Sequence, residues 1–418
     1  MSAAPGRPQT SSHRSAQHEG IPVNTTTYYY VRPTDSLFIR GNLAFGDSGE
    51  HGASQMPPPP SLFAGAFRSA ILGQSAEHMA QFLAGQPLAD EARARCLGTY
   101  TQPGEFRLSW LSLAGQAHGQ VSPEAVSPLP ADLVVLGQAF APLIPRSVAA
   151  GCASSGDLPM RATLFSAKQE KPSTGIYLRG AGLQDHLTGK LPGAAAQAAV
   201  GHLFRRDPRL GIGLNADSRT AEEGLIYTTE GYAFGPGADG EGEGKVSPFA
   251  NTGFLVGMAG VADVLPAQGS LRLGGDGRSA HYQRVEFKPP VAANLAANKR
   301  FRLVLQSPAL FSQGWLPDGV VLQEDGLYKL RGAGFSARLA CAAIGRREVV
   351  SGWDLHGWKP KPAQAAAPAG SVYWFDELEG DAGKLAAWVN QGLWGEHTDR
   401  QRRAEGFNQA LLATWQNN

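Results

Sequence analysis

One segment limits the possible folds of this chain more than any other. Residues 211–227 have the sequence GIGLNADSRTAEEGLIY, in which two apolar stretches enclose a polar one. The pattern predicts two strands joined by a tight turn, because Asn, Asp and Ser side chains bond to the neighbouring backbone. The turn contains more polar residues than reversing the chain requires. It is therefore either a surface that contacts a partner or a plain solvated loop.

Glycine and proline favour a fold rich in turns. The chain of 418 residues contains 52 Gly and 29 Pro, about a fifth of the total, and only 17% of its residues are charged. This proportion is below the level typical of disorder, so we predict loops and short elements rather than a helical bundle. The length predicts two or three domains. A net charge of +1 argues against an extended basic coat for nucleic acid but leaves room for a local basic groove.

Cysteine spacing and hydropathy predict a cytoplasmic protein. Cys96, Cys152 and Cys341 lie far apart and form no CxxC pair, so no disulfide framework is predicted. Residues 1–24 are polar, lack the apolar core of a signal peptide, and are predicted to form a disordered arm. The longest apolar run, residues 254–265, is too short and too rich in glycine to span a bilayer.

The segment after this arm predicts a strand, a loop and an amphipathic helix. Residues 25–39 have the β-branched and aromatic content of a strand. Four prolines at 57–60 then precede Ser61, which we predict to be the N-cap of the helix. One face of this helix is apolar, and the other side carries a stripe made of Ser61, Gly65, Arg68 and Leu72. The stripe is either a contact surface or a solvated face beside a packing glycine.

Farther along the chain, short strands alternate with short helices. Residues 194–204 are rich in alanine and are predicted to be helical, and residues 236–245 are predicted to form a flexible hairpin tip. A final helix is predicted at residues 382–390. Further strands are predicted at residues 106–113, 133–136, 254–264, 271–273, 283–287, 301–305 and 373–375. Such a mixture predicts an α+β fold.

The sequence contains no recognised catalytic motif. Its ten histidines form neither HExxH nor another metal-ligand spacing, and GxSxG and the Walker loop are both missing. The neighbours Asp185 and His186 are interpreted as a surface turn rather than a catalytic dyad. We therefore predict neither a metal ion nor a cofactor.

A second glycine-rich segment, residues 271–278, has the sequence LRLGGDGR. It is a weak match to a dinucleotide fingerprint. Its glycines allow positive φ, and successive N–H groups in such a loop can form an anion nest. Arg272 and Arg278 flank the glycines with donors that suit phosphate. The alternative is a tight hairpin turn. The three glycines are Gly274, Gly275 and Gly277.

A third segment places aromatic rings beside cations. Trp353 and Trp358 offer faces for stacking, and Lys359 and Lys361 each precede a proline that restricts the backbone. Aromatic side chains interleaved with cations are typical of surfaces that bind single-stranded RNA. The alternative is a pair of core tryptophans followed by a solvated Lys-Pro linker.

Taken in order, seven segments of the chain resemble one family. It is the RAMP-superfamily subunit of type III-B CRISPR–Cas effector complexes that holds the 5′ tag of the guide RNA, the third protein of the Cmr module. The chain departs from the family in having GGDGR where GGEGR is usual. The segments are RPTDSLFIRGNLAF (32–45), PPPPSLFAGAFRSAIL (57–72), LPADLVVL (129–136), GIYLRGAGLQDHLTGK (175–190), residues 211–227, residues 271–278, and GWKPKP followed by PAGSVYWF (357–375).

The resemblance implies an α+β fold with two ferredoxin-like (RRM-like) domains, long insertions and glycine-rich loops. The domains are expected at residues 25–205 and 206–418, after the arm at 1–24. The resemblance also implies a non-catalytic role in antiviral defence. The expected partners are the crRNA 5′ tag, the large polymerase-like subunit and the first backbone subunit, with no membrane and no direct contact to DNA.

We hypothesise that the RNA-binding surface is formed by the helix stripe, the polar turn, the glycine loop and the Lys-Pro segment. Two alternatives stay open: a metal-independent RNA endonuclease, with His51 or Tyr227 as general base, and a pure protein scaffold. The predicted RNA-binding residues are Arg40, Ser61, Gly65, Arg68, Asn215, Arg219, Glu223, Gly274, Gly275, Gly277, Arg278, Lys359 and Lys361.

Overall fold

The computed structural model covers most of the chain. Arg40, the predicted arm and the predicted hairpin tip at 236–245 lie outside the described residues, so nothing is said of their structure. The described residues are 26–39, 51–52, 56–148, 156–167, 169–215, 217–235, 247–275, 277–292, 299–354, 356–395 and 399–415.

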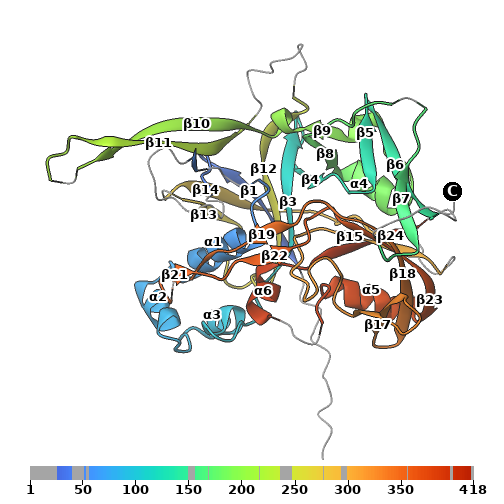
Figure 1. Ribbon diagram of the computed structural model, residues 1–418. Coiled ribbons are helices and arrows are strands. Elements are labelled where there is room, and N and C mark those ends of the chain that lie inside the picture. The colour runs from blue at the N-terminus through green and yellow to red at the C-terminus, as the bar shows by residue number, and fades with distance from the viewer. Residues whose placement is uncertain are drawn as a thin grey trace, which may run out of the picture.

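The molecule is a mixed α/β structure made mostly of strands, arranged around two large sheets (Figure 1). The first sheet has eight antiparallel strands in the order β13-β14-β1-β12-β3-β4-β8-β9. Its strands are β1 Thr27–Pro33, β3 Arg107–Ala117, β4 Glu124–Pro128, β8 Ile176–Arg179, β9 Gln197–Ala199, β12 Phe249–Ala259, β13 Gln268–Arg272 and β14 Ser279–Val285.

The apolar face of helix α1 (Pro60–Leu72) packs on this sheet, as its sequence predicts. The ring of Phe63 lies 4.8 Å from that of Phe254 on β12, and Phe67 packs against Tyr29 and Tyr282. These contacts close the first core, because the three strands that provide the rings are neighbours or next neighbours in the sheet. Two further helices follow α1, namely α2 Ala76–Leu83 and α3 Glu91–Leu97.

The start of α1 differs from the prediction. The helix begins at Pro60, its N-cap is Pro59, and no side chain caps it, so the prediction of Ser61 as N-cap is wrong. Proline fits the first helical position because the N–H group that it lacks has no intrahelical partner there. Leu72, predicted on the exposed stripe, is buried.

Strands β10 (Phe204–Leu214) and β11 (Ala221–Phe234) form an antiparallel arm that projects from the rest of the molecule (Figure 1). The strand-turn-strand prediction for residues 211–227 is therefore confirmed. A two-residue strand, β2 (His51–Gly52), pairs with β11 in parallel. Leu210, Ile212 and Leu214 alternate along β10 with their side chains exposed, so the arm carries an apolar stripe.

The helix predicted at residues 194–204 is wrong. This segment consists of two short 3₁₀ turns, Ala194–Ala196 and Val200–His202, on either side of β9. Ala198 in β9 is buried opposite Tyr177 of β8. Pairing with the sheet therefore overrides the helix propensity of alanine, which is only a weak preference.

The second sheet has six antiparallel strands in the order β16-β17-β18-β23-β15-β24. Helices α5 (Ala382–Asn390) and α6 (Arg400–Glu405) lie between β23 and β24 in the chain, and α5 contacts β18 and β24. The strands are β15 Phe301–Leu305, β16 Val320–Leu322, β17 Tyr328–Gly332, β18 Phe335–Ala343, β23 Val372–Gly380 and β24 Ala410–Thr414.

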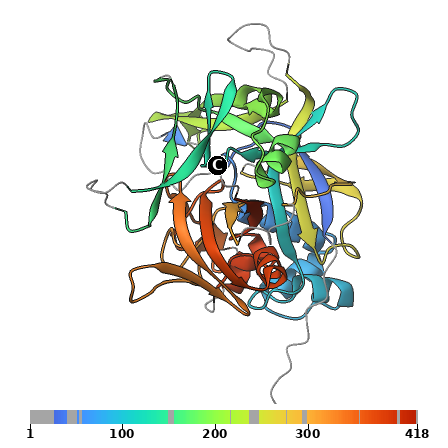
Figure 2. The same cartoon turned by 90° about the vertical axis from the view of Figure 1, so that its right-hand side faces the viewer.

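Smaller elements join the two sheets. A three-stranded sheet of β5 (Leu133–Leu136), β6 (Ala139–Ser147) and β7 (Met160–Leu164) lies at one side of the molecule, and β7 contacts β18 (Figure 2). Helix α4 (Gly180–Leu187) contacts both β4 and β24. One buried cluster contains Trp110 of β3 and Trp374 of β23, so the two large sheets share a core.

The first sheet takes strands from both sides of the expected domain boundary. Strands β12, β13 and β14, at residues 249–285, pair with β1 and β3 from the first part of the chain. The domain boundary expected between residues 205 and 206 lies just inside β10. Strands of the first sheet therefore come from both before and after this boundary. No helix in the described ranges is long and apolar enough to cross a membrane.

Candidate functional site

Phe38 lies at the centre of an ionic cluster that includes one of the predicted arginines. The guanidinium carbons of Arg209 and Arg278 lie 5.3 and 5.4 Å from the centre of its ring. Arg278 forms an ion pair with Asp35, and Arg209 forms one with Asp207 at 2.8 Å. Two cations thus face two carboxylates, so this cluster has no formal excess of positive charge.

The glycine loop is the turn of the β13–β14 hairpin, which was the alternative interpretation of its sequence. The amide of Gly275 donates to the carbonyl oxygen of Phe38 at 2.8 Å and is therefore not available to an anion nest. Gly274 has φ +78°, and a Cβ at this position would lie 2.5 Å from the same carbonyl oxygen. The Gly274 position thus requires glycine for both its φ and its close contact with Phe38. Gly277, with φ +65°, has open space around it.

These contacts show what Arg278 does within the chain. The hairpin turn binds the backbone of Phe38, and Arg278 binds the side chain of Asp35. Arg209 adds a hydrogen bond to the Ser36 hydroxyl at 3.2 Å. The cluster therefore fixes the segment immediately before Arg40, which itself lies outside the described residues. Arg278 is a positioning residue for this segment, and an RNA phosphate would have to compete with Asp35 for it.

Arg68 of the helix stripe is partly buried rather than displayed. Its guanidinium carbon lies 4.8 Å from the centre of the Phe106 ring. Burial holds the pKa of Arg68 below its usual value, and the nearby carboxylate of Glu405 partly offsets this effect. Gly65 is exposed, and no atom of the described chain would touch a Cβ placed there. Ser61 is half-buried in the first turn.

The polar turn of the β10–β11 arm uses several of its polar groups to reverse the chain. The side-chain oxygen of Asn215 accepts hydrogen bonds from the amides of Asp217 and Ser218, both at 3.0 Å. The hydroxyls of Ser218 and Thr220 lie 2.8 Å apart. Arg219 is exposed at the turn with φ +56°. Arg219 therefore remains the best candidate for an external contact here. Glu223 lies on β11, and its side chain is outside what the structure describes.

The two lysines of the Lys-Pro segment have different surroundings. Lys361 forms an ion pair with the buried Glu405 at 2.8 Å. Lys359 is exposed on β21 (Lys359–Pro360), which pairs with β20 (Trp353–Asp354). The rings of Trp353 and Trp358 meet edge to face at 5.8 Å and are 49% and 73% exposed. The interpretation as core tryptophans is thus wrong, and this hairpin displays two indoles beside a lysine.

The rest of this β20–β21 hairpin is fixed to the body of the protein. The hydroxyl of Tyr100 donates to Asp354 at 2.8 Å, and the His356 ring packs against that of Tyr100 at a tilt of 30°, with centroids 4.3 Å apart. His356 Nδ1 also lies 3.0 Å from the carbonyl oxygen of Leu83. The hairpin is therefore held at its polar side, while Trp358 at its tip projects into solvent.

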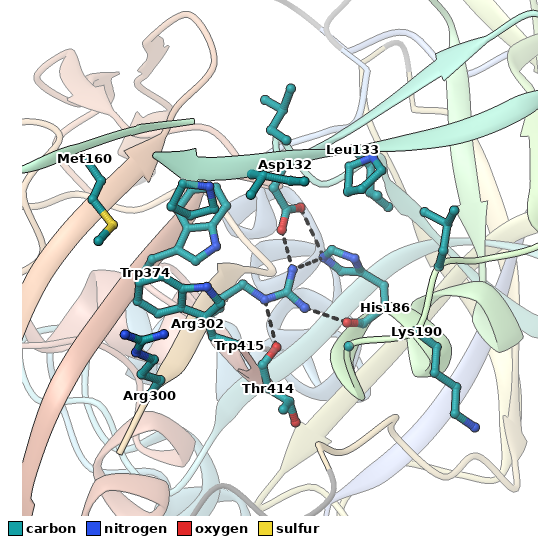
Figure 3. A pocket seen from close by; sticks show the side chains of 16 residues that line it. Asp132, Leu133, Met160, His186, Lys190, Arg300, Arg302, Trp374, Thr414 and Trp415 are labelled. Atoms are coloured by element: carbon teal, nitrogen blue, oxygen red, sulfur yellow. Dashed lines mark hydrogen bonds and ion pairs between the residues drawn. The ribbon is translucent and has the colours of Figure 1, made fainter. Parts of the chain in front are cut away.

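His186 is the functional candidate that sequence reasoning misjudged. It is not in a surface turn but buried on α4, where its Nε2 lies 3.1 Å from Asp132 Oδ1 and 3.2 Å from Arg302 Nη1 (Figure 3). Arg302 also pairs with Asp132 and donates to the carbonyl oxygens of His186 at 2.6 Å and Thr414 at 3.0 Å. Burial alone would raise the pKa of Asp132, but its two partners lower it to about 2.

The described residues give no further support to a hydrolytic site. They contain no cluster of three or more metal-ligating side chains. Two residues were candidates for the general base. His51 is described only by its backbone, which pairs with Thr228 of β11, and Tyr227 directly precedes Thr228 on that strand. The endonuclease alternative stays a prediction.

Comparison with known proteins identifies the family. A family described as "CRISPR-associated protein (Cas_Cmr3)" matches residues 29–415. The chain is therefore a CRISPR-associated protein. It belongs, more narrowly, to the Cas_Cmr3 family, which confirms the family expected from the seven sequence segments. No curated protein matches the chain.

Two solved structures are similar to the chain. One is the type III-B Cmr-beta complex bound to cognate target RNA and AMPPnP, with 15% identity, a TM-score of 0.45, and coverage of 83% of this chain and 86% of that one. The other is Cmr-beta bound to cognate target RNA, with 14% identity, a TM-score of 0.47, and coverage of 92% and 96%. Likenesses this distant do not bear on the function of this chain.

Proposed function

We propose that this protein is a non-catalytic subunit of a type III-B CRISPR effector complex that binds the 5′ tag of the crRNA in the cytoplasm. In that complex it docks the large polymerase-like subunit and the first backbone subunit. The observation that carries the proposal is membership of the Cas_Cmr3 family over residues 29–415.

The order of the strands supports a ferredoxin-like origin for both sheets. Numbered along the chain, β1, β3, β12 and β14 lie in the order 4-1-3-2, and so do β15, β18, β23 and β24. This all-antiparallel order is that of ferredoxin-like βαββαβ units. Each sheet keeps one of the two expected helices, α1 after the first strand of the first sheet and α5 after the third strand of the second.

The β20–β21 hairpin is the described surface whose chemistry best suits single-stranded RNA. Bases of any sequence stack on exposed aromatic faces, and a nearby cation attracts the backbone phosphates. Trp353, Trp358 and Lys359 provide this combination, and a second exposed cation, Arg219, lies on the arm. The neutral cluster at Phe38 would serve instead to hold residues 35–38 against the β13–β14 turn.

The test is the affinity of the protein, co-purified with the large subunit, for a guide RNA with and without its 5′ tag. Removal of the tag is expected to weaken binding clearly, because the tag would lose its stacking and phosphate contacts. Equal affinity for both RNAs would contradict tag binding and would favour a structural adaptor. Incubation with precursor guide RNA in EDTA tests the non-catalytic assignment, which specific cleavage lost in His51→Ala would overturn.

A further inference from the structure

We propose that the exposed face of the sheet edge formed by β13, β14 and β1 binds the phosphate backbone of single-stranded RNA. These three strands are neighbours at one end of the eight-stranded sheet, where β13 is the last strand (Figure 1). Helix α1 packs on their other face. None of the residues predicted from the sequence to bind RNA forms the exposed face, so the proposal goes beyond the tag-binding surface.

Alternation along the strands defines this face. Leu271, Ala280 and Tyr282 are buried in the core that α1 closes, and the residues that alternate with them are exposed. The pairing of the strands arranges the exposed residues in three rows across the sheet. We call this surface the edge face. Its rows are Arg272, Ser279 and Thr34; Ser270, His281 and Arg32; and Gln268 and Gln283.

The edge face contains two arginines and a histidine but no carboxylate. Arg32, Arg272 and His281 are all exposed, and no ion pair joins any of them to another residue in the described part of the chain. The whole chain has 37 basic and 36 acidic residues, so its composition does not explain a face of one sign. Solvated surfaces normally mix both signs. An external anion would supply the charge that the chain does not provide here.

Three of these side chains lie close enough together to contact one phosphate group. Arg32 and His281 are directly opposite each other, which places their Cβ atoms about 5 Å apart, and Arg272 lies about 7–8 Å from His281 on the diagonal. Ser270 Oγ lies 3.0 Å from His281 Nδ1. The Ser270 hydroxyl can donate to Nδ1, and the neutral ring then carries its proton on Nε2, which has no partner in the described chain.

The other residues of the edge face suit the RNA backbone rather than the bases. Arginine, serine, threonine and glutamine side chains are common donors to phosphate and sugar oxygens. The hydroxyls of Thr34 and Ser279 lie 2.7 Å apart beside the cations. Ribose 2′-hydroxyls both donate and accept, so they offer partners to the amides of Gln268 and Gln283, which favours RNA over an acidic protein segment. Because no residue of the face is aromatic, binding is expected to be independent of sequence.

The experiment measures binding of a labelled oligouridylate without a tag to the full chain, by fluorescence anisotropy at several salt concentrations. Arg32→Ala and Arg272→Ala are each expected to weaken binding about two- to fivefold, the usual range for one exposed ionic contact. Each should also reduce the slope of log affinity against log salt concentration by about one. The combined variant should lose about tenfold, because separate contacts add. Arg346→Ala, which removes an exposed arginine after β18, is the control and should change neither quantity.

A matched pair of variants at His281 supplies the missing carboxylate. His281→Glu places a carboxylate directly opposite Arg32, where opposite charges stabilise a cross-strand pair, whereas His281→Gln is neutral. We expect the Glu variant to be at least as stable as the Gln variant in urea unfolding. It should nevertheless bind RNA clearly less tightly, because Arg32 then has a partner within the chain. Equal affinities of the two variants for RNA would overturn the proposal.

Two further results would overturn it. If the combined arginine variant binds oligouridylate as tightly as Arg346→Ala does, the edge face is only a solvated surface. If polyglutamate binds as tightly as oligouridylate and depends on the same two arginines, the partner is an acidic protein.

The test also separates this proposal from tag binding. The edge-face variants are expected to weaken tagged and untagged guide RNA by the same factor, so the edge face can bind RNA even if removal of the tag has no effect. A loss confined to the tagged RNA would contradict binding that is independent of sequence and would overturn the proposal.

Discussion

The guanidinium of Arg68 packs over the ring of Phe106, with 4.8 Å between its central carbon and the ring centre. Phe106 is buried beneath it, immediately before β3, and α1 contacts both β3 and α6. Arg68 thus links the helix to its neighbours through a stacked and partly desolvated cation. This position differs from the exposed phosphate ligand that the helix stripe suggested.

We predict that Arg68→Ala lowers the free energy of unfolding by about 0.5–2 kcal/mol, the usual range for a cation–π contact. The loss of the aliphatic stem adds to it, since long side chains cover apolar surface. Urea unfolding measures the change. Arg219→Ala, which removes an exposed arginine on the arm, is the control and is expected to have almost no effect on stability. Equal stability of the two variants would contradict this role of Arg68.

The ion pair of Asp132 and Arg302 predicts a second, larger effect. Asp132→Ala leaves the buried Arg302 without its carboxylate, and we expect a loss of about 3–5 kcal/mol. Asp185→Ala, one residue before His186 on the same helix, is the matched control. Its side chain is not part of this ion pair, so little change is expected. Thermal or urea unfolding of both variants at pH 7 tests the difference.

The same carboxylate predicts a dependence on pH. Because the folded-state pKa of Asp132 is lowered to about 2, its charge stabilises the fold above its unfolded pKa of about 4. This contribution is lost as the pH falls from about 4 toward 2. The stability difference between the natural protein and Asp132→Asn, which cannot titrate, should therefore shrink over that interval. A difference that stays constant from pH 7 to pH 2.5 would contradict the lowered pKa.

The sequence predicted those features that depend on nearby residues. The two strands and the turn at residues 211–227 follow from turn chemistry within the segment, and α1 follows from apolar spacing along one face. The helix predicted at residues 194–204 failed because β9 pairs with β8, some twenty residues away. Local propensity contains no information on that pairing.

The buried trio shows why the most distant relationships escaped prediction. Asp132, His186 and Arg302 come from a loop, a helix and a strand that meet only after the two sheets pack. Asp185 and His186 are polar, as residues of surface turns usually are. The sequence alone therefore could not distinguish a surface turn from a buried position on a helix. Neighbouring lysines differ for the same reason: Lys359 is exposed, whereas Lys361 pairs with the buried Glu405, which is distant in the sequence.

The glycine turn offers a matched pair of substitutions. Gly274→Ala must place a Cβ 2.5 Å from the Phe38 carbonyl oxygen, whereas Gly277→Ala meets open space. Both glycines have positive φ, which costs an alanine about 1–2 kcal/mol. We therefore expect both variants to be less stable than the natural protein and Gly274→Ala to be clearly the worse. Urea unfolding of the two side by side measures this, and equal losses would contradict the close contact with Phe38.

The β20–β21 hairpin gives the most direct prediction about RNA. Trp358 is 73% exposed, so Trp358→Ala should leave stability unchanged while weakening binding of single-stranded RNA by about 1–3 kcal/mol through lost stacking. Lys359→Ala should lower the affinity for RNA. It should also reduce the slope of log affinity against log salt concentration by about one, the value expected for one lost phosphate contact. Lys171→Ala, an exposed lysine in another part of the chain, should change neither quantity.

Fluorescence anisotropy with a labelled tag RNA, titrated at several salt concentrations, measures both effects. Trp358→Phe is expected to retain part of the affinity, because a smaller aromatic ring still stacks on a base. This graded order, natural protein then Phe then Ala, separates stacking from an indirect loss of structure. If Trp358→Ala and Lys359→Ala both bind the tag as tightly as the natural protein, the RNA-binding surface lies elsewhere, and Arg219 on the arm becomes the next position to substitute.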